Sequence, residues 1–165
     1  MFNIFNGPPV SFNRDGGPSL AHSGVYADLT GVSEGDEAPT IQIKSTGRPL
    51  YVVAINAMDT AYSDIQIEVA STSFIPSDAT SGETAITVAS SAQYGSVATN
   101  STASKGGGVA GAATAPYYSP DNQSPQHNLL MPPIFVGPNK YVSIKRDASV
   151  SAIELCVFWV EIFSE

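Results

Sequence analysis

Hydrophobic and polar residues alternate in two segments of the chain. Segment 40–44, TIQIK, places Ile41 and Ile43 between polar residues, and segment 64–70, DIQIEVA, repeats this pattern. Because successive side chains of a strand point to opposite faces, the alternation predicts two strands of an antiparallel sheet, each with one face in water. The residues expected to point into the core are Ile41, Ile43, Ile65, Ile67 and Val69.

Other segments also have the composition of strands. Segment 50–57, LYVVAINA, is apolar at both parities, and its Val and Ile content favours a strand that is covered on both faces. Shorter expected strands are 84–90, 133–137 and 140–146, each bounded by turn-forming residues. The only helix candidate, 57–64, is short and polar. We therefore predict an all-β fold, an antiparallel β-sandwich of jelly-roll type.

The C-terminal segment 152–163, AIELCVFWVEIF, is apolar on both faces of the expected strand. Such a strand cannot leave one face in water without exposing a large apolar patch. One interpretation is that a bulge or loops of the same chain cover the second face. The other is that this face packs on a second copy or on another protein. The residues predicted to self-associate in this way are Cys156, Phe158, Val160 and Ile162.

Residues 1–19 have the pattern of an extended arm. Pro8 and Pro9 disfavour helix and hold the chain extended, and a turn-like stretch ends at Pro18. The aromatic and aliphatic residues predicted to bind a partner are Phe2, Ile4, Phe5, Val10 and Phe12. The alternative is that this segment is an ordinary first strand. Residues 20–165 are expected to form the single sandwich domain.

Residues 90–133 consist mostly of Gly, Ala, Ser, Thr, Pro and Asn, and they predict a long loop inside that domain. Loops of this length are usually functional or disordered. We expect an ordered excursion that pairs its backbone with a neighbouring surface, with Tyr117 and Tyr118 as partner-binding residues. Disorder of residues 105–112 is the alternative.

Charge and composition narrow the range of partners. Only 13% of the 165 residues are charged, about half the usual share, and the net charge is −8. Binding to nucleic acid or to an anionic membrane is not expected, because there is no Lys/Arg cluster to contact phosphates. The N-terminus lacks the pattern of a signal peptide, and no apolar run has transmembrane length. With a single cysteine, Cys156, a disulfide framework is excluded and a buried structural thiol is favoured.

Catalytic and metal-binding motifs are missing from the sequence. His22 and His127 have no partners at metal-ligand spacing. The acidic run 33–37, SEGDE, matches no calcium-loop motif and is interpreted as a solvated turn. No nucleophile elbow occurs, and a buried Cys156 is badly placed for attack. We expect no enzymatic activity, no cofactor and no metal.

An acidic, helix-poor chain with an aromatic N-terminal arm, Gly/Ala/Ser/Thr-rich loops and the two-faced strand ELCVFWVEI resembles the capsid decoration, or cement, proteins of tailed bacteriophages. This is a likeness of organisation over the whole chain. It implies a structural protein, made in the host cytoplasm, that forms a homo-oligomer, with a trimer favoured. The implied partner is the major capsid protein, and the implied location is the outer capsid surface of the virion.

A carbohydrate- or receptor-binding β-sandwich of a phage fibre or cell surface is the alternative. In that case Tyr117, Tyr118 and Tyr94 are expected to stack on sugar rings.

Overall fold

The computed structural model describes residues 19–32, 38–59, 65–92, 99–108, 117–118, 126–146 and 153–163. This part of the chain consists of strands and connections and contains no helix. The strands are β1 (Ser19–Asp28), β2 (Ala38–Lys44), β3 (Leu50–Asp59), β4 (Ile65–Ala70), β5 (Thr84–Ile86), β6 (Ala89–Ala92), β7 (Thr102–Gly108), β8 (Tyr117–Tyr118), β9 (Gln126–Val136), β10 (Tyr141–Arg146) and β11 (Ile153–Phe163).

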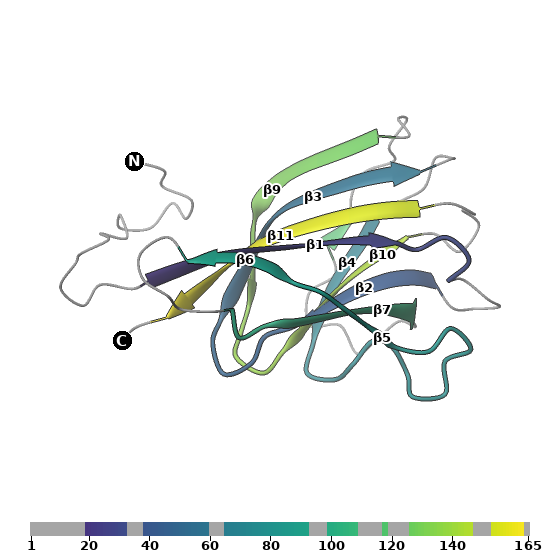
Figure 1. Ribbon diagram of the computed structural model, residues 1–165, viewed down its shortest axis with the longest axis horizontal. Helices are drawn as coiled ribbons and strands as arrows, with labels where there is room; N and C mark the ends of the chain where they lie inside the picture. Colours follow the sequence, from purple (N-terminus) through teal and green to yellow (C-terminus); the bar gives the residue numbers. More distant parts are fainter. Residues whose placement is uncertain are drawn as a thin grey trace.

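The strands form two antiparallel sheets that face each other as two layers (Figure 1). Sheet A has the order β6-β1-β11-β3-β9, and sheet B has the order β5-β7-β2-β10-β4-β8. Side chains from both sheets meet in one hydrophobic core between them. The predicted all-β antiparallel sandwich is confirmed.

The two halves of the chain pair with each other in reverse order. Strand β1 pairs with β11, β2 with β10, β3 with β9 and β4 with β8. Successive pairs alternate between sheet A and sheet B. The sandwich is therefore one long antiparallel ribbon, with its ends at β1 and β11, that is wound into two layers.

The alternating isoleucines pack in the core as predicted. Ile41 and Ile43 are fully buried, and Ile65, Ile67 and Val69 on β4 are also buried. Sheet A contributes Trp159 at the opposite side of the core, where the indole Nε1–H donates a hydrogen bond to Ser101 Oγ at 2.8 Å. This contact satisfies the one polar atom of a large buried aromatic ring.

The expected strand at 84–90 is divided between the two sheets. Strand β5 pairs with β7 at the edge of sheet B, and β6 pairs with β1 at the edge of sheet A. Figure 1 shows this segment crossing from one layer to the other. It pairs with both edge strands on one side of the sandwich, and a paired edge is protected from association with strands of other proteins.

The prediction of a wet outer face on β2 is wrong. Thr40 is fully buried and Gln42 is 2% exposed. The connection 71–83 lies over this face, where Gln42 Oε1 accepts a hydrogen bond from the Phe74 backbone N–H at 2.9 Å and Gln42 Nε2 donates to Glu83 Oε1 at 2.9 Å. The alternating pattern of β2 therefore predicts only which side chains point into the core. Whether the other face is exposed to solvent depends on the connection 71–83, which is distant in sequence.

Part of the predicted loop 90–133 is also a strand. Strand β7 contains the glycine run and pairs with β2, so residues 105–108 are ordered strand. The Gly107 backbone N–H donates to Ser81 O at 2.8 Å, and a Cβ on Gly106 would lie 2.9 Å from the same oxygen. The glycines let the connection 71–83 approach the sheet, which explains why a segment of low strand propensity is a strand here.

Candidate interaction surface

The outer face of sheet A carries the exposed aromatic side chains of the described structure. Tyr26 on β1, Phe135 on β9 and Phe158 on β11 are 55%, 53% and 41% exposed, and they are the only large hydrophobic residues with this exposure among the side chains that the structure describes. Their neighbours in sequence point into the core, so all three project outward. We call Tyr26, Tyr51, Phe135, Cys156 and Phe158 the aromatic face.

The register of β1 and β11 positions the centre of this face. Tyr26 lies opposite Cys156, and Gly24 lies opposite Phe158. The Phe158 ring covers Gly24 so closely that a Cβ there would lie 2.9 Å from Cδ1 of the ring. Gly24 thus allows the ring to lie against the sheet, which explains why Phe158 is partly covered.

A second aromatic contact lies on β3 and β9. Tyr51 and Phe135 are register partners, with ring centroids 5.2 Å apart and planes tilted by 54°. The tilted arrangement is favourable for aromatic rings. The register between β3 and its neighbours shifts at Val53, between Val52 and Ala54. Phe158 lies on β11, which neighbours β3 in the same sheet, and its register partner on β3 is Ala54.

Negative charge lies at one end of the aromatic face. Partial desolvation, followed by the nearby carboxylate of Glu154, raises the pKa of Tyr26. Desolvation and then Glu154 also raise the pKa of the Cys156 thiol. The thiol is therefore protonated at neutral pH, which disfavours a nucleophilic role. Cys156 is half-buried on the outer face, so the interpretation of a fully buried thiol is corrected.

The residues predicted to self-associate lie in different environments. Phe158 is exposed, Cys156 and Ile162 are half-buried, and Val160 is 1% exposed. Val160 lies opposite His22 of β1 and Tyr51 of β3. Since Val160 is already buried in the single chain, it contributes no free surface to a partner.

Tyr26 and Phe135 were not among the candidates chosen from the sequence. Each lies between two core residues of a strand, in the segments Val25–Ala27 and 134–136. The signal that identifies such a position is an aromatic residue where the alternating pattern of a strand calls for a polar, outward-facing residue. The pattern of β1 is too polar to predict a strand, and segment 133–137 is too short to show which parity faces the core.

The predicted arm residues Phe2, Ile4, Phe5, Val10 and Phe12 lie outside the described residues. Tyr117 and Tyr118 form β8, whose backbone pairs with Ile67 and Gln66 of β4 at the edge of sheet B. Their side chains are outside the description, as are those of His22 and His127.

Glu161 is a buried acid of the described structure, and it has a structural role. Its carboxylate accepts hydrogen bonds from the backbone N–H groups of Asn100 and Ser101, both at 2.9 Å, and from the hydroxyls of Thr99 and Ser101. Burial acts to raise the pKa of Glu161, but these hydrogen bonds from Ser101, Thr99 and Asn100 together lower it. These hydrogen bonds attach residues 99–101, which directly precede β7, to strand β11.

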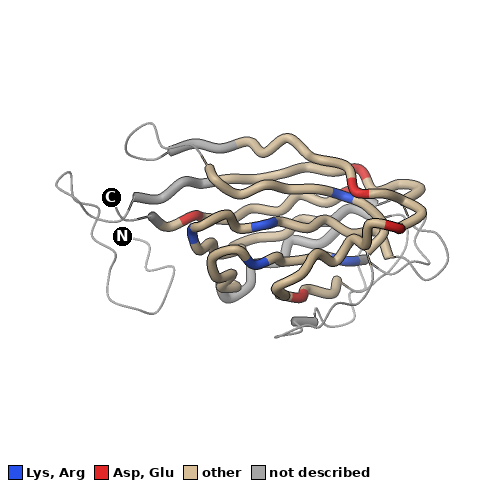
Figure 2. The backbone as a smooth tube through the Cα atoms, turned by 90° about the horizontal axis from the view of Figure 1, so that it is seen from below, with Lys and Arg blue, Asp and Glu red and all other residues tan. Residues whose placement is uncertain are grey.

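The charged positions of the described chain are dispersed. Figure 2 shows Lys and Arg at separate places along the tube, interspersed with Asp and Glu. Within the described ranges, no three His, Cys, Asp or Glu side chains are grouped so that they could hold a metal ion. Nor does this part of the chain contain a helix long and apolar enough to cross a membrane.

No family model, curated protein or solved structure matches this chain.

Proposed function

We propose that this protein is a structural component of a bacteriophage particle, which decorates the outside of the capsid and stabilises it by bridging neighbouring capsid subunits. The observation that carries the proposal is the aromatic face on the outer side of sheet A. The wound ribbon supports it, because the pairing of the first half of the chain with the second in reverse order is the pairing expected of the predicted jelly roll. Jelly rolls are common in capsid and lectin domains.

The size of the aromatic face fits a docking surface. Aromatic side chains present about 150–250 Å² each, so the exposed fractions of Tyr26, Phe135 and Phe158, 55%, 53% and 41%, amount to roughly 300 Å². The three side chains lie on three different strands of the same sheet, and apolar area that gathers on one face is often functional. A standard interface buries about 800 Å² on each partner, so further contacts must surround the patch. The predicted arm, residues 1–19, is our candidate for that additional contact.

The occupant of the aromatic face is proposed to be a second copy of the chain, in a homo-oligomer for which we favour a trimer. An oligomer on a symmetric shell binds several capsid subunits at once, which raises its overall affinity without any new type of contact. The net charge of −8 supports a position outside the shell, because a protein that faces packaged DNA gains from positive charge.

The test of the capsid role uses virus particles purified from the biological source of the sequence. Mass spectrometry should detect the protein in stoichiometric amount with the major capsid protein. Antibodies against the folded protein should label the outside of intact particles in electron micrographs. If the protein is missing from the particles, or is labelled only after they are broken open, the proposed function is wrong.

A carbohydrate-binding function is the second candidate, and the pair of the exposed Phe135 with the partly buried Tyr51 favours it. Aromatic rings fixed on a sheet provide a platform for the apolar faces of sugars. In that case a glycan array should detect binding by the wild type, and Phe135→Ala should remove it. Without any glycan signal at micromolar protein, this candidate is excluded.

A further inference from the structure

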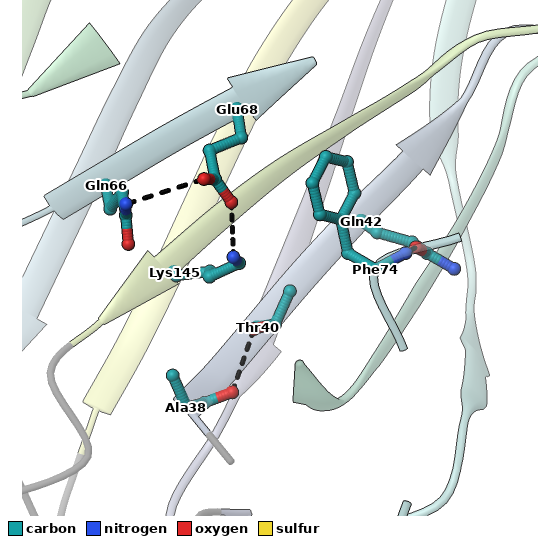
Figure 3. A network of polar contacts seen from close by, with 7 residues as sticks. All are labelled: Ala38, Thr40, Gln42, Gln66, Glu68, Phe74 and Lys145. Carbon is teal, nitrogen blue, oxygen red and sulfur yellow. Dashed lines mark hydrogen bonds and ion pairs between the residues drawn. The ribbon is translucent and has the colours of Figure 1, made fainter. Parts of the chain in front are cut away.

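The outer face of sheet B holds a buried ion pair that the proposed function does not use. Lys145 on β10 is 3% exposed and Glu68 on β4 is 4% exposed. Figure 3 shows Lys145 Nζ directed at one oxygen of the Glu68 carboxylate, to which it donates a hydrogen bond. The Phe74 ring, on the connection 71–83, lies 5.2 Å from Nζ. The amine is thus held away from water, between a carboxylate and an aromatic ring.

A carboxamide completes the group. Gln66 lies directly opposite Lys145 in the pairing of β4 with β10. Its Nε2 is 3.5 Å from Oε1 of Glu68, and Lys145 contacts Oε2 of the same carboxylate. One carboxylate therefore bridges an amine and a carboxamide on neighbouring strands (Figure 3). Gln66 is only partly buried, so a small molecule released from its side chain has a route to solvent.

A buried ion pair such as Lys145–Glu68 is not expected to add much to the free energy of unfolding. Desolvation of two charges offsets much of their attraction, and apolar residues of similar size often stabilise a protein as well or better. The direct contact of Lys145 Nζ with Glu68 Oε2 provides a path for transfer of a proton from the amine to the carboxylate. The transfer produces a neutral lysine amine, which is the nucleophilic form.

We propose that Lys145 and Gln66 form an intramolecular isopeptide bond, with Glu68 as the proton carrier. Glu68 takes a proton from the Lys145 ammonium, and the amine lone pair then forms a bond to Gln66 Cδ. Glu68 gives this proton to Gln66 Nε2, the Cδ–Nε2 bond breaks, and ammonia leaves. The remaining excess proton on the new amide nitrogen passes through Glu68 to ammonia, which departs as ammonium. The step needs no oxidant, reductant or further reactant.

The bond joins Gln66, near the start of β4, to Lys145, near the end of β10, and these two strands are adjacent in sheet B. It closes a covalent loop from residue 66 to residue 145, which contains β5 to β9 and the connection 71–83. A cross-link across such a long loop stabilises mainly by restricting the unfolded chain. It therefore resists unfolding whether or not the protein is bound to a partner, and the inference does not rest on the proposed function.

The mass of the folded, purified full-length protein tests this bond. Loss of ammonia lowers the mass by about 17 Da relative to the sequence. After digestion, tandem mass spectrometry should identify a branched peptide that joins Lys145 to Gln66. An unmodified mass in protein kept folded for days at neutral pH overturns the proposal, and the group is then a non-covalent ion pair only. A loss of about 18 Da, with a branch at Glu68, also overturns it, since water has then left instead of ammonia.

Two variants and one control identify the groups. Lys145→Arg removes the nucleophile and Glu68→Gln removes the proton carrier, and each should restore the full sequence mass. Lys140→Arg is the matched control, because Lys140 Nζ contacts only the exposed Ser71 hydroxyl in the described structure, and it should keep the wild-type deficit. If the deficit persists in Lys145→Arg, it arises elsewhere in the chain and the assignment is wrong.

Discussion

Replacement of Phe158 by aspartate is the most direct test of self-association through the aromatic face. Phe158 is 41% exposed, so about 80 Å² of a side chain of roughly 200 Å² is available to a partner. At about 25 cal/mol per Å², burial of this area contributes about 2 kcal/mol on each copy. In an interface that buries the ring from both copies, its loss weakens association by about 4 kcal/mol, or roughly a thousandfold in Kd.

Aspartate adds a desolvation penalty to the lost contact, so the thousandfold change is a lower estimate. Sedimentation velocity over a range of concentrations should show the wild type as an oligomer and Phe158→Asp as a monomer. Thr102→Asp is the matched control, because Thr102 is exposed on β7 of the other sheet, and it should keep the wild-type mass. Circular dichroism must show the same β content for all three proteins.

The reasoning is refuted if the wild type is monomeric at tens of micromolar, or if Phe158→Asp sediments like the wild type. The first result removes the second copy as occupant and leaves docking on a capsid subunit to be tested separately. Val160→Asp is not an equivalent test, because Val160 is 1% exposed. A charge there would unfold the monomer before it reported on an interface.

Three further outcomes are expected. Gly24→Ala should lower the free energy of unfolding by about 1–3 kcal/mol in urea titrations, because the new methyl displaces the Phe158 ring; an unchanged midpoint contradicts this contact. Because the pKa of Glu161 is lower in the folded protein, its contribution to stability is present above its unfolded pKa and is lost as pH falls through the folded pKa. Glu161→Gln should therefore be less stable at pH 7 and depend less on pH in the acid range, whereas equal acid-unfolding profiles would be inconsistent with this. Deletion of residues 1–12 should barely move the thermal midpoint, since this segment is predicted to be an extended arm, and should abolish particle binding; a sharp loss of stability would show that the segment is an internal strand.

The core of both sheets could be predicted from local pattern wherever the pattern was strong. Strands β2 and β4 alternate with period two, and their isoleucines and Val69 are buried as expected. Strand β1, SLAHSGVYAD, was missed because small and polar residues occupy most of its length. Its strand conformation depends on pairing with β11 over all ten residues, which is a tertiary effect that the local sequence does not encode.

The aromatic face and the Lys145–Glu68–Gln66 group could not be predicted from the sequence, and the reason is the same for both. Each is made of residues that are ordinary within their own strand and become significant only through register. A slip of one residue between β4 and β10 would place Lys145 opposite Ile65 or Ile67 and send the side chains to opposite faces. The alternation of apolar residues on these strands prevents that slip, because the isoleucines must remain in the core. The same pattern that specifies the fold thereby brings an amine, a carboxylate and a carboxamide together on its outer side.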